Sequence, residues 1–376
     1  MTSTNASPFV TVAPRLGPVL AERAAIHDRE GSFVAENYEL LREHKLFSAG
    51  VPRELGGGGA SHAELCELLR ELGRYCGSTA LALSMHTHLV AAAVWRHRHG
   101  QPAEALLRKI AASELVLVST GAGDWVESRG HAERVPGGYS VCANKGFASG
   151  CPAGDLLVTS APYDDPERGV EVLHFAVPLN AKGVSLCSDW DTLGMRGTGS
   201  HSVDLDQVFV ADEAISLRRP RGRWHPSWNV IMTVAPPLYI APYLGVAEAA
   251  AQEARAQAKT RAPDSTLVQT LGELENTLTV GQMAFREMIE LANEYDFAPD
   301  DALASRMLVR KTLVANAAMS TVAKAIELVG GSAYFRKAGL ERLFRDVQGA
   351  PFHPLPEKRQ LEFTGRVLLG LSPVET

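Results

Sequence analysis

The stretch that decides the fold is Trp190–Glu213, with the sequence WDTLGMRGTGSHSVDLDQVFVADE. It begins with a glycine-rich segment, Gly194–Ser200, and continues into a segment where apolar and polar residues alternate. A period of two predicts a half-buried strand. A phosphate-binding glycine loop leads instead into a helix, whose N-terminus binds the phosphate. Residues 194–200 are therefore expected to form a tight turn before a strand, and not a nucleotide-phosphate loop.

Three stretches, in this order along the chain, resemble motifs of one known family. Asn144–Gly150, NKGFASG, resembles the strand on which the flavin ring lies in the acyl-CoA dehydrogenase superfamily. Trp190–Val210 resembles the W-x-x-x-G-x-R-x-[ST]-x-S run in the middle β-domain of that family. Glu327–Tyr334, ELVGGSAY, is similar to the turn that meets the cofactor. With their helical flanks, these motifs extend the resemblance over nearly the whole chain.

The composition is that of an ordinary globular protein. Hydrophobic residues make up 45% and charged residues 21% of 376 residues, enough chain for two or three packed units. The net charge of −6, without a run of like charge, argues against nucleic acid or an anionic membrane as a partner. No apolar run is expected to approach the ~20 residues that span a bilayer.

The cysteines and the N-terminus predict a cytoplasmic protein. The five cysteines are scattered and include no C-x-x-C pair, which argues against a zinc site or a disulfide framework. They are expected to be reduced thiols. The N-terminus lacks the charged region and apolar core of a secretory signal.

The pattern of residues divides the chain into three expected domains and an α+β fold. Residues 1–114 show helical periods, including one helix from about Pro18 to Lys45 and a capping box at Ser61. Residues 115–222 contain short Val-rich runs between turns, which favours a β-barrel-like domain. Residues 223–376 contain segments of ~30 residues that suit a four-helix bundle, the first expected to begin at Leu238. This order matches the architecture of the family.

The resemblance implies a bound flavin, FAD by family habit with FMN as the alternative. Phe147 matches the aromatic residue that packs against the isoalloxazine, and Ser149 matches the hydroxyl residue beside flavin N5. Both assignments make physical sense, because an aromatic face stabilises a planar ring and a hydroxyl can donate to a ring nitrogen. The structural alternative for Phe147 is an ordinary residue of the strand core.

A second flavin contact is implied by the segment Val118–Asp124, which resembles the family's T-E-P-G-A-G-S-D loop. It keeps Gly-Ala-Gly but lacks the proline and the acidic residue. Only the role of the backbone amides therefore carries over, at Val118, Ser119 and Gly123.

Two more cofactor contacts are implied far from these in the chain. Arg261 matches the arginine of an R-x-x-F motif that reaches the cofactor pyrophosphate of a neighbouring subunit, although Asp264 replaces the phenylalanine. The ordinary alternative is an arginine that interacts with a helix dipole. Gly330 and Gly331 match the turn that meets the cofactor. The family's bundle implies a homotetramer, a dimer of dimers.

The catalytic base of the family's dehydrogenases is missing. Where those enzymes place the glutamate that removes the α-proton of the substrate, this chain has Pro354. At the family's second location for this base it has Leu238. The nearest carboxylate is Glu357, at the start of the last helix, where it could be a base or simply a partner of the helix dipole.

A histidine, His353, lies beside Pro354. The presence of a histidine at this position, after Arg-Asp-Val and a short spacer, resembles the flavin-dependent monooxygenases built on the same fold. Those enzymes also use a histidine from the N-terminal helices, for which His86 and His88 are the candidates, and a Ser-Gly pair that matches Ser149 and Gly150. Such imidazoles can donate to a C4a-peroxyflavin and accept a proton from the substrate. The alternative for each histidine is a purely structural role.

Three functions follow as hypotheses. The first is a two-component monooxygenase that receives reduced flavin from a flavin reductase and hydroxylates a small-molecule substrate. The second is an acyl-CoA dehydrogenase that passes electrons to an electron-transfer flavoprotein. The third is a flavin-binding scaffold without activity, which the retained flavin-bed residues, Phe147 and Ser149, disfavour.

Overall fold

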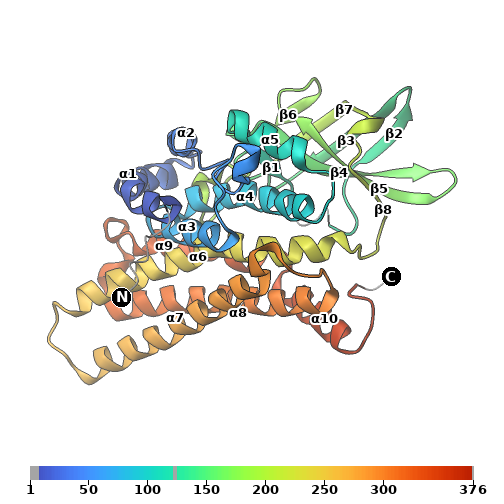
Figure 1. Ribbon diagram of the computed structural model, residues 1–376. Coiled ribbons are helices and arrows are strands. Elements are labelled where there is room, and N and C mark those ends of the chain that lie inside the picture. The colour runs from blue at the N-terminus through green and yellow to red at the C-terminus, as the bar shows by residue number, and fades with distance from the viewer. Residues whose placement is uncertain (1–7, 122–124, 375–376) are drawn as a thin grey trace.

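The computed structural model describes residues 8–121 and 125–374. A helical N-terminal part is followed by a β-sheet and then by a second helical part (Figure 1). The N-terminal helices are α1 (Pro8–Glu30), α2 (Ala35–Glu43), α3 (His62–Tyr75), α4 (Gly77–Arg98) and α5 (Glu104–Ser113).

The first helical segment differs from the prediction, whereas the capping box is confirmed. The single helix expected from Pro18 to Lys45 is two helices, α1 and α2, because Gly31 adopts a left-handed φ of +66° and ends α1. At the start of α3, the Ser61 hydroxyl accepts from the backbone N–H of Glu64 at 3.1 Å. The Glu64 carboxylate accepts in return from the backbone N–H of Ser61 at 2.7 Å.

The middle of the chain forms an eight-stranded sheet. Its strands are β1 (Leu117–Ser119), β2 (His131–Val135), β3 (Gly138–Lys145), β4 (Leu156–Asp165), β5 (Gly169–Pro178), β6 (Val184–Leu186), β7 (Val203–Ala211) and β8 (Leu217–Pro220). The order is β6-β7-β3-β2-β4-β5-β8, with β1 paired to β4. The described pairing leaves β6 and β8 at opposite ends of the path, so it establishes a sheet without establishing the closure of a barrel.

The alternating strand predicted from the deciding stretch is β7. Val203 and Leu205 are buried, and the buried positions then shift by one place to Val208 and Val210. Between them Gln207 has a left-handed φ of +51° and places one extra residue opposite β3. The apolar side chains therefore stay on the core face although the period of two is interrupted.

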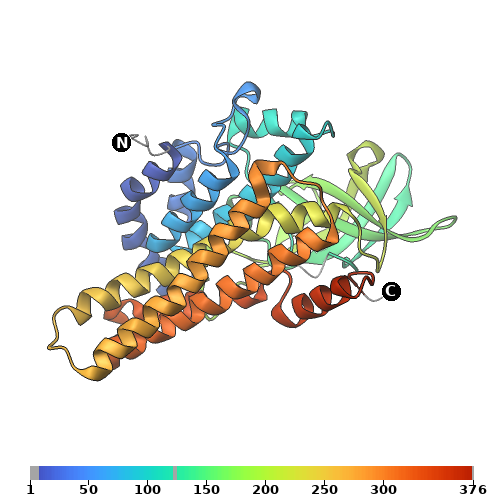
Figure 2. The ribbon, with the colours of Figure 1, turned by 60° about the horizontal axis from the view of Figure 1, so that its bottom comes forward.

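The C-terminal part is built from three long helices and two short ones. They are α6 (Ser227–Ala258), α7 (Ser265–Ala292), α8 (Asp301–Val329), α9 (Leu340–Val347) and α10 (Glu357–Leu368). The long helices lie side by side, and α10 lies beside α8 (Figure 2). Helix α6 begins well before the expected Leu238 and contains Pro236, Pro237 and Pro242.

The expectation about apolar runs was wrong for α6. Ser227–Ala258, like Asp301–Tyr334, is long and apolar enough to cross a membrane by length and composition alone. In α6, however, 94% of the apolar window is buried inside the protein. Its length therefore reflects a central core position, because it packs against α3 and α4 on one side and α7 and α8 on the other.

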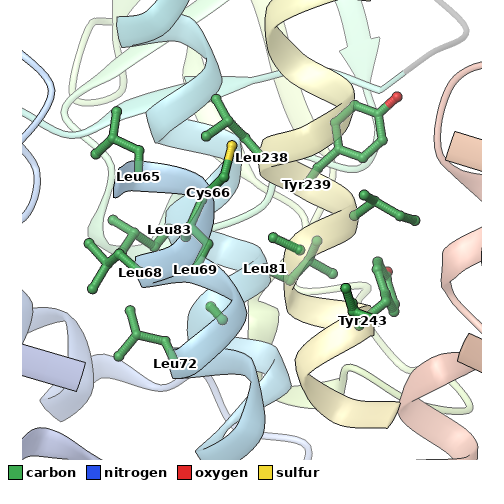
Figure 3. Close-up of a cluster of buried hydrophobic side chains, with 14 of the residues drawn as sticks. Leu65, Cys66, Leu68, Leu69, Leu72, Leu81, Leu83, Leu238, Tyr239 and Tyr243 are labelled. Atoms are coloured by element: carbon green, nitrogen blue, oxygen red, sulfur yellow. The ribbon is translucent and has the colours of Figure 1, made fainter. Parts of the chain in front are cut away.

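One face of α6 packs on the N-terminal helices and another faces the candidate site. Figure 3 shows a cluster of leucines from α3 and α4 against α6, close to Leu238. Tyr239 and Tyr243 lie one turn apart on α6 and point away from the leucines of α3. This arrangement orients two aromatic residues toward the segment that follows α9.

Candidate active site

A cavity of about 580 Å³ lies where the sheet, α4, α6 and the segment after α9 meet. Its volume is within the range that suits a cofactor or drug-sized ligand. The wall is contributed by α4 (Leu81, Met85, His88), by the segments around β1 to β3 (Ser119 to Gly121, Trp125, Arg129, Asn144, Gly146, Phe147, Ser149), by the glycine-rich turn and the residues before it (Trp190, Thr192 to Met195, Ser200), by α6 (Ile231, Ala235, Tyr239, Tyr243), and by α9 and the residues after it (Arg345, Gln348, Gly349, Phe352 to Pro354).

Phe147 presents an exposed aromatic ring to this cavity. Its side chain is 65% exposed, and its backbone has a left-handed φ of +58°, which is uncommon for a bulky residue. The ring packs edge-to-face on Trp190, with centroids 5.8 Å apart. Phe147 is therefore not a residue of the strand core, and its turned-out backbone explains why its ring can contact a ligand.

Ser149 lies at the end of a chain of hydroxyl groups. Its oxygen is 2.7 Å from the Ser200 hydroxyl, which is 2.7 Å from the Thr198 hydroxyl. Thr198 is fully buried and also donates to the Met195 carbonyl at 3.0 Å. The glycine-rich turn thus holds the Ser149 hydroxyl in place at the cavity wall.

The predicted flavin loop is only partly described. Ser119 lines the cavity, together with Thr120 and Gly121. The Val118 side chain is fully buried in the core of the sheet. Gly123 lies outside the described residues.

The structure separates the two candidate histidines of α4. His88 lines the cavity. His86 is 1% exposed, its Nε2 lies 2.8 Å from the Phe47 carbonyl, and its Nδ1 accepts from the Leu117 N–H at 2.9 Å. Both nitrogens of His86 therefore bond to backbone, and this histidine ties α4 to β1 instead of facing the cavity.

His353 lines the cavity from the segment after α9. Its Nε2 lies 2.7 Å from the Tyr243 hydroxyl oxygen, and Tyr239 stacks on its ring with centroids 5.0 Å apart and planes 18° apart. Burial, with a smaller contribution from Lys311, lowers the pKa of His353 to about 3. Burial likewise lowers the pKa of His88 to about 4. Both imidazoles are consequently neutral near pH 7.

A buried lysine holds the backbone at His353 and just after it. Lys311 on α8 is 1% exposed, and its Nζ donates to the carbonyls of His353 at 3.1 Å and Leu355 at 2.6 Å. Burial lowers the pKa of Lys311 to about 8. Tyr239 adds a third anchor, because its hydroxyl donates to the Pro354 carbonyl.

The described wall of the cavity contains no aspartate or glutamate. Pro354 lines it at the place of the family's dehydrogenase base, and Leu238 is fully buried away from it. Glu357 begins α10 and is not part of the wall. The arrangement therefore offers imidazole and hydroxyl groups for proton transfer, and no carboxylate.

The family models match both helical parts of the chain. The N-terminal domain of acyl-CoA dehydrogenases matches residues 16–114, and the C-terminal domain matches residues 238–355. Together the two matches span more than half of the sequence. The chain belongs to the acyl-CoA dehydrogenase superfamily. This confirms the resemblance carried by the three motifs.

Superfamily members of more than one activity resemble this chain. The candidate acyl-CoA dehydrogenase YdbM of Bacillus subtilis is 28% identical over 90% of this chain and 91% of its own. The dibenzothiophene monooxygenase of Mycolicibacterium goodii is 27% identical over 87% of this chain and 85% of its own. Among solved structures, KijD3 in complex with FMN and dTDP-3-amino-2,3,6-trideoxy-4-keto-3-methyl-D-glucose is 26% identical, with a TM-score of 0.88 over 98% of this chain and 96% of its own.

The remaining predicted cofactor residues of this superfamily member lie elsewhere. Arg261 donates from Nη1 to the Leu328 carbonyl at 2.6 Å, which places it beside the turn at Gly330 and Gly331. None of the three lines the cavity. Within one chain, the structure thus groups Arg261 with the glycine turn and separates both from Phe147.

Three residues of the site were missed at the sequence level. Tyr239 and Tyr243 are four residues apart, and this helical spacing could have predicted that they share a face. Lys311 carries no such signal, because an isolated lysine in a helix usually points to solvent.

Proposed function

We propose that this protein is a flavin-dependent monooxygenase that receives reduced flavin from a separate reductase. The observation that carries the proposal is that two neutral imidazoles, His88 and His353, face a cavity whose described wall has no carboxylate. A neutral imidazole can donate one proton and accept another, which suits an oxygen transfer. The similarity to a dibenzothiophene monooxygenase supports this choice.

The residues present fit a flavin. An aromatic ring that is 65% exposed at Phe147, facing a cavity of about 580 Å³, is an arrangement that a planar aromatic ligand would cover. Phe147 would contact the ring, Ser149 would hydrogen-bond to it, and the backbone at Ser119 and Gly121 would lie alongside. We propose FMN, which the FMN-bound KijD3 structure supports, with FAD as the superfamily alternative. When bound in its reduced form, the flavin supplies the activation of molecular oxygen.

One part of the wall favours a small substrate with an apolar part. Leu81 and Met85 on α4 and Ile231 on α6 line the cavity beside His88. An apolar wall excludes water and stabilises a substrate through burial, at about 25 cal/mol per Å². His88 and His353 would orient the substrate heteroatom and move its proton. Neither neutral imidazole would compensate the charge of an anionic substrate, but two cationic residues, Arg129 and Arg345, also line the cavity.

The dehydrogenase hypothesis has one supporting observation, the similarity to YdbM. That reaction requires a base that removes the α-proton of an acyl thioester. Pro354 occupies one family position for it, and Leu238 the other. The scaffold hypothesis is weaker still, since a scaffold does not require an exposed flavin bed or two neutral histidines in one cavity.

Further features of the proposal concern assembly and location. We propose a homotetramer. With FAD, the superfamily alternative, Arg261 would reach the cofactor pyrophosphate of a neighbouring subunit beside the turn at Gly330 and Gly331, whereas FMN has no pyrophosphate for this arginine. Tyr334 and Phe335, which follow that turn, are 89% and 61% exposed and suit a contact between subunits.

The cysteines are free in the structure, which supports a cytoplasmic location. We retain the division into residues 1–114, 115–222 and 223–376 as a proposal.

Two variants distinguish the enzymatic hypotheses. Under the monooxygenase hypothesis, His353→Ala keeps flavin binding but lowers the yield of oxygenated product and releases hydrogen peroxide instead. The loss should be large, because general acid–base groups contribute ~10²–10⁴-fold. Glu357→Gln should leave that yield unchanged. Both variants are assayed with reduced flavin and oxygen, and separately with acyl-CoA and an electron acceptor. An inactive Glu357→Gln beside a fully active His353→Ala would reject the monooxygenase.

A further inference from the structure

We infer that Tyr243 positions His353 by fixing its tautomer, so that the imidazole presents its Nδ1–H group to the cavity as a hydrogen-bond donor. Tyr243 would thus act through His353 and not on the substrate itself. The inference rests on the proposed function only for the consequence in turnover. The tautomer itself is a property of the protein without ligand.

The first step is the hydrogen bond between the two residues. The Tyr243 hydroxyl oxygen and His353 Nε2 are 2.7 Å apart, a short and well-formed contact. Tyr243 is 1% exposed, so water does not substitute for a protein partner. Within the described residues, His353 is the only hydrogen-bond partner that the structure shows for this hydroxyl.

The second step is the direction of that bond. If Tyr243 donates, Nε2 is the acceptor and the ring proton of a neutral imidazole must sit on Nδ1. If Nε2 carried the proton and donated, the buried phenol hydrogen would have no protein acceptor. Leaving a buried polar hydrogen unpaired costs ~1–3 kcal/mol. The first arrangement is therefore favoured, by about 5- to 150-fold in population.

The third step is that the ring cannot easily turn over to exchange its nitrogens. Tyr239 stacks on one face of the imidazole. Lys311 holds the backbone of His353, because its Nζ donates to the His353 carbonyl at 3.1 Å. Charged and titratable groups around the pair also disfavour a second proton on the ring. Lys311 and His88 both act to lower the pKa of His353, and Asp346 acts with burial to keep the Tyr243 phenol protonated.

The sequence places both tyrosines for this purpose. Residues 239 and 243 are separated by four positions on α6, so their side chains lie one above the other on one face. Figure 3 shows both rings on the side of α6 turned away from the leucines of α3. One tyrosine contacts the face of the imidazole and the other its edge. The pair therefore sets both the plane of the ring and the position of its proton.

The test begins with the tautomer. The protein is labelled with ¹⁵N-histidine, and the His353 resonances are assigned by their loss in His353→Gln. Wild type should show a protonated Nδ1 and an unprotonated, hydrogen-bonded Nε2. Tyr243→Phe removes the donor and keeps the ring, and it should shift the population toward protonated Nε2. A wild-type spectrum with the proton on Nε2, or an unchanged spectrum in Tyr243→Phe, overturns the inference.

The matched control is Tyr239→Phe. It removes a hydroxyl from the same face of α6 one turn earlier, but that hydroxyl bonds the Pro354 carbonyl and not the imidazole. The tautomer should therefore be unchanged. An equal shift in both variants means that loosening of the loop, and not the Tyr243 donor, sets the tautomer, and this would overturn the inference. Should Tyr243→Phe not fold, wild type with 3-fluorotyrosine, a stronger donor of the same shape, should move the Nε2 resonance further toward the hydrogen-bonded position. An unmoved resonance overturns it.

Turnover supplies the second readout. With a flavin reductase and oxygen, Tyr243→Phe should lower product per reduced flavin by at least about 10-fold while flavin affinity stays unchanged, since misplaced tautomers of catalytic histidines are costly. A shifted tautomer with wild-type product yield leaves the positioning by Tyr243 supported and rejects the catalytic role proposed for His353. The two failures are thus distinguishable.

Discussion

The Asp346 carboxylate accepts a hydrogen bond of 2.6 Å from the backbone N–H of Met195, which joins α9 to the glycine-rich turn. Arg345, the preceding residue, donates to the Leu193 carbonyl at 3.1 Å. Helix α9 therefore holds the backbone on both sides of Gly194. Because this turn also anchors Ser149 through Thr198 and Ser200, the contact between α9 and the turn supports the wall of the cavity.

Gly194→Ala should disrupt this contact. An added Cβ would lie 2.1 Å from the Arg345 carbonyl oxygen, which is backbone and cannot move aside cheaply. We expect a loss of stability of about 1–3 kcal/mol, as for other overpacked positions, together with weaker flavin binding. Urea unfolding and flavin titration measure the two effects. Gly272→Ala on α7 is the control, because its Cβ would meet nothing within 4 Å and should stabilise the helix. If Gly194→Ala kept the stability and the flavin affinity of wild type, the turn would have to move freely to accommodate the added Cβ.

Asp346→Asn should change how stability depends on pH. Burial raises the pKa of Asp346 to about 6, above its value of 3.8 in an unfolded chain. As the pH rises, the unfolded state therefore loses this proton before the folded state does. The folded state is destabilised relative to the unfolded state between about pH 4 and 6, because it still holds the proton there. The neutral asparagine variant should gain about 2–3 kcal/mol relative to wild type across that range. Urea denaturation of both proteins at pH 4.5 and 7 tests this. The same change in the free energy of unfolding between the two pH values in both proteins would contradict it.

Phe147→Ala should weaken flavin binding. Loss of a stacked aromatic costs ~1–3 kcal/mol, or about 5- to 150-fold in affinity. Phe209→Ala is the matched control, since Phe209 on β7 is also exposed, at 57%, but does not line the cavity. Fluorescence titration with FMN and FAD measures both variants and also decides between the cofactors. If Phe147→Ala binds flavin as tightly as wild type, the ring lies elsewhere.

The two histidines of α4 should behave oppositely. His86→Gln disturbs bonds to the Phe47 carbonyl and the Leu117 N–H, and it should cost about 2–4 kcal/mol of stability. His88→Gln should keep the fold and flavin binding but lower the yield of product. Thermal unfolding and a product assay on both variants separate the roles. If His86→Gln kept the stability of wild type but formed no product, His86 and not His88 would be the catalytic histidine of α4.

The fold was predictable because its signals are local. The alternation that became β7, the capping box at Ser61 and the long helical periods each depend on residues close in the chain. The three motifs then identified the family, which the domain matches confirm. The helix boundaries were less accurate, because α6 continues through Pro236 and Pro237 where a local rule predicts an end.

The candidate site was predictable only in part. Phe147, Ser149 and His353 were found through motifs and line one cavity. The choice between His86 and His88 depended on which face of α4 meets α6, a tertiary property. The role of Lys311 could not be predicted for the same reason, because its hydrogen-bond partners are carbonyls of residues far along the chain.

The last prediction concerns assembly. Val280 and Met283 are three residues apart on α7, share a face, and are 50% and 62% exposed. Exposed apolar side chains on a bundle helix favour contact with another subunit. The double variant Val280→Asp and Met283→Glu should therefore lower the mass measured by light scattering from that of a tetramer. Val170→Asp, at a position 42% exposed on β5, is the control and should keep the tetramer. A monomeric wild type at micromolar concentration would refute the tetramer. An intact tetramer in the double variant would move the interface to another face, such as the turn at Tyr334 and Phe335.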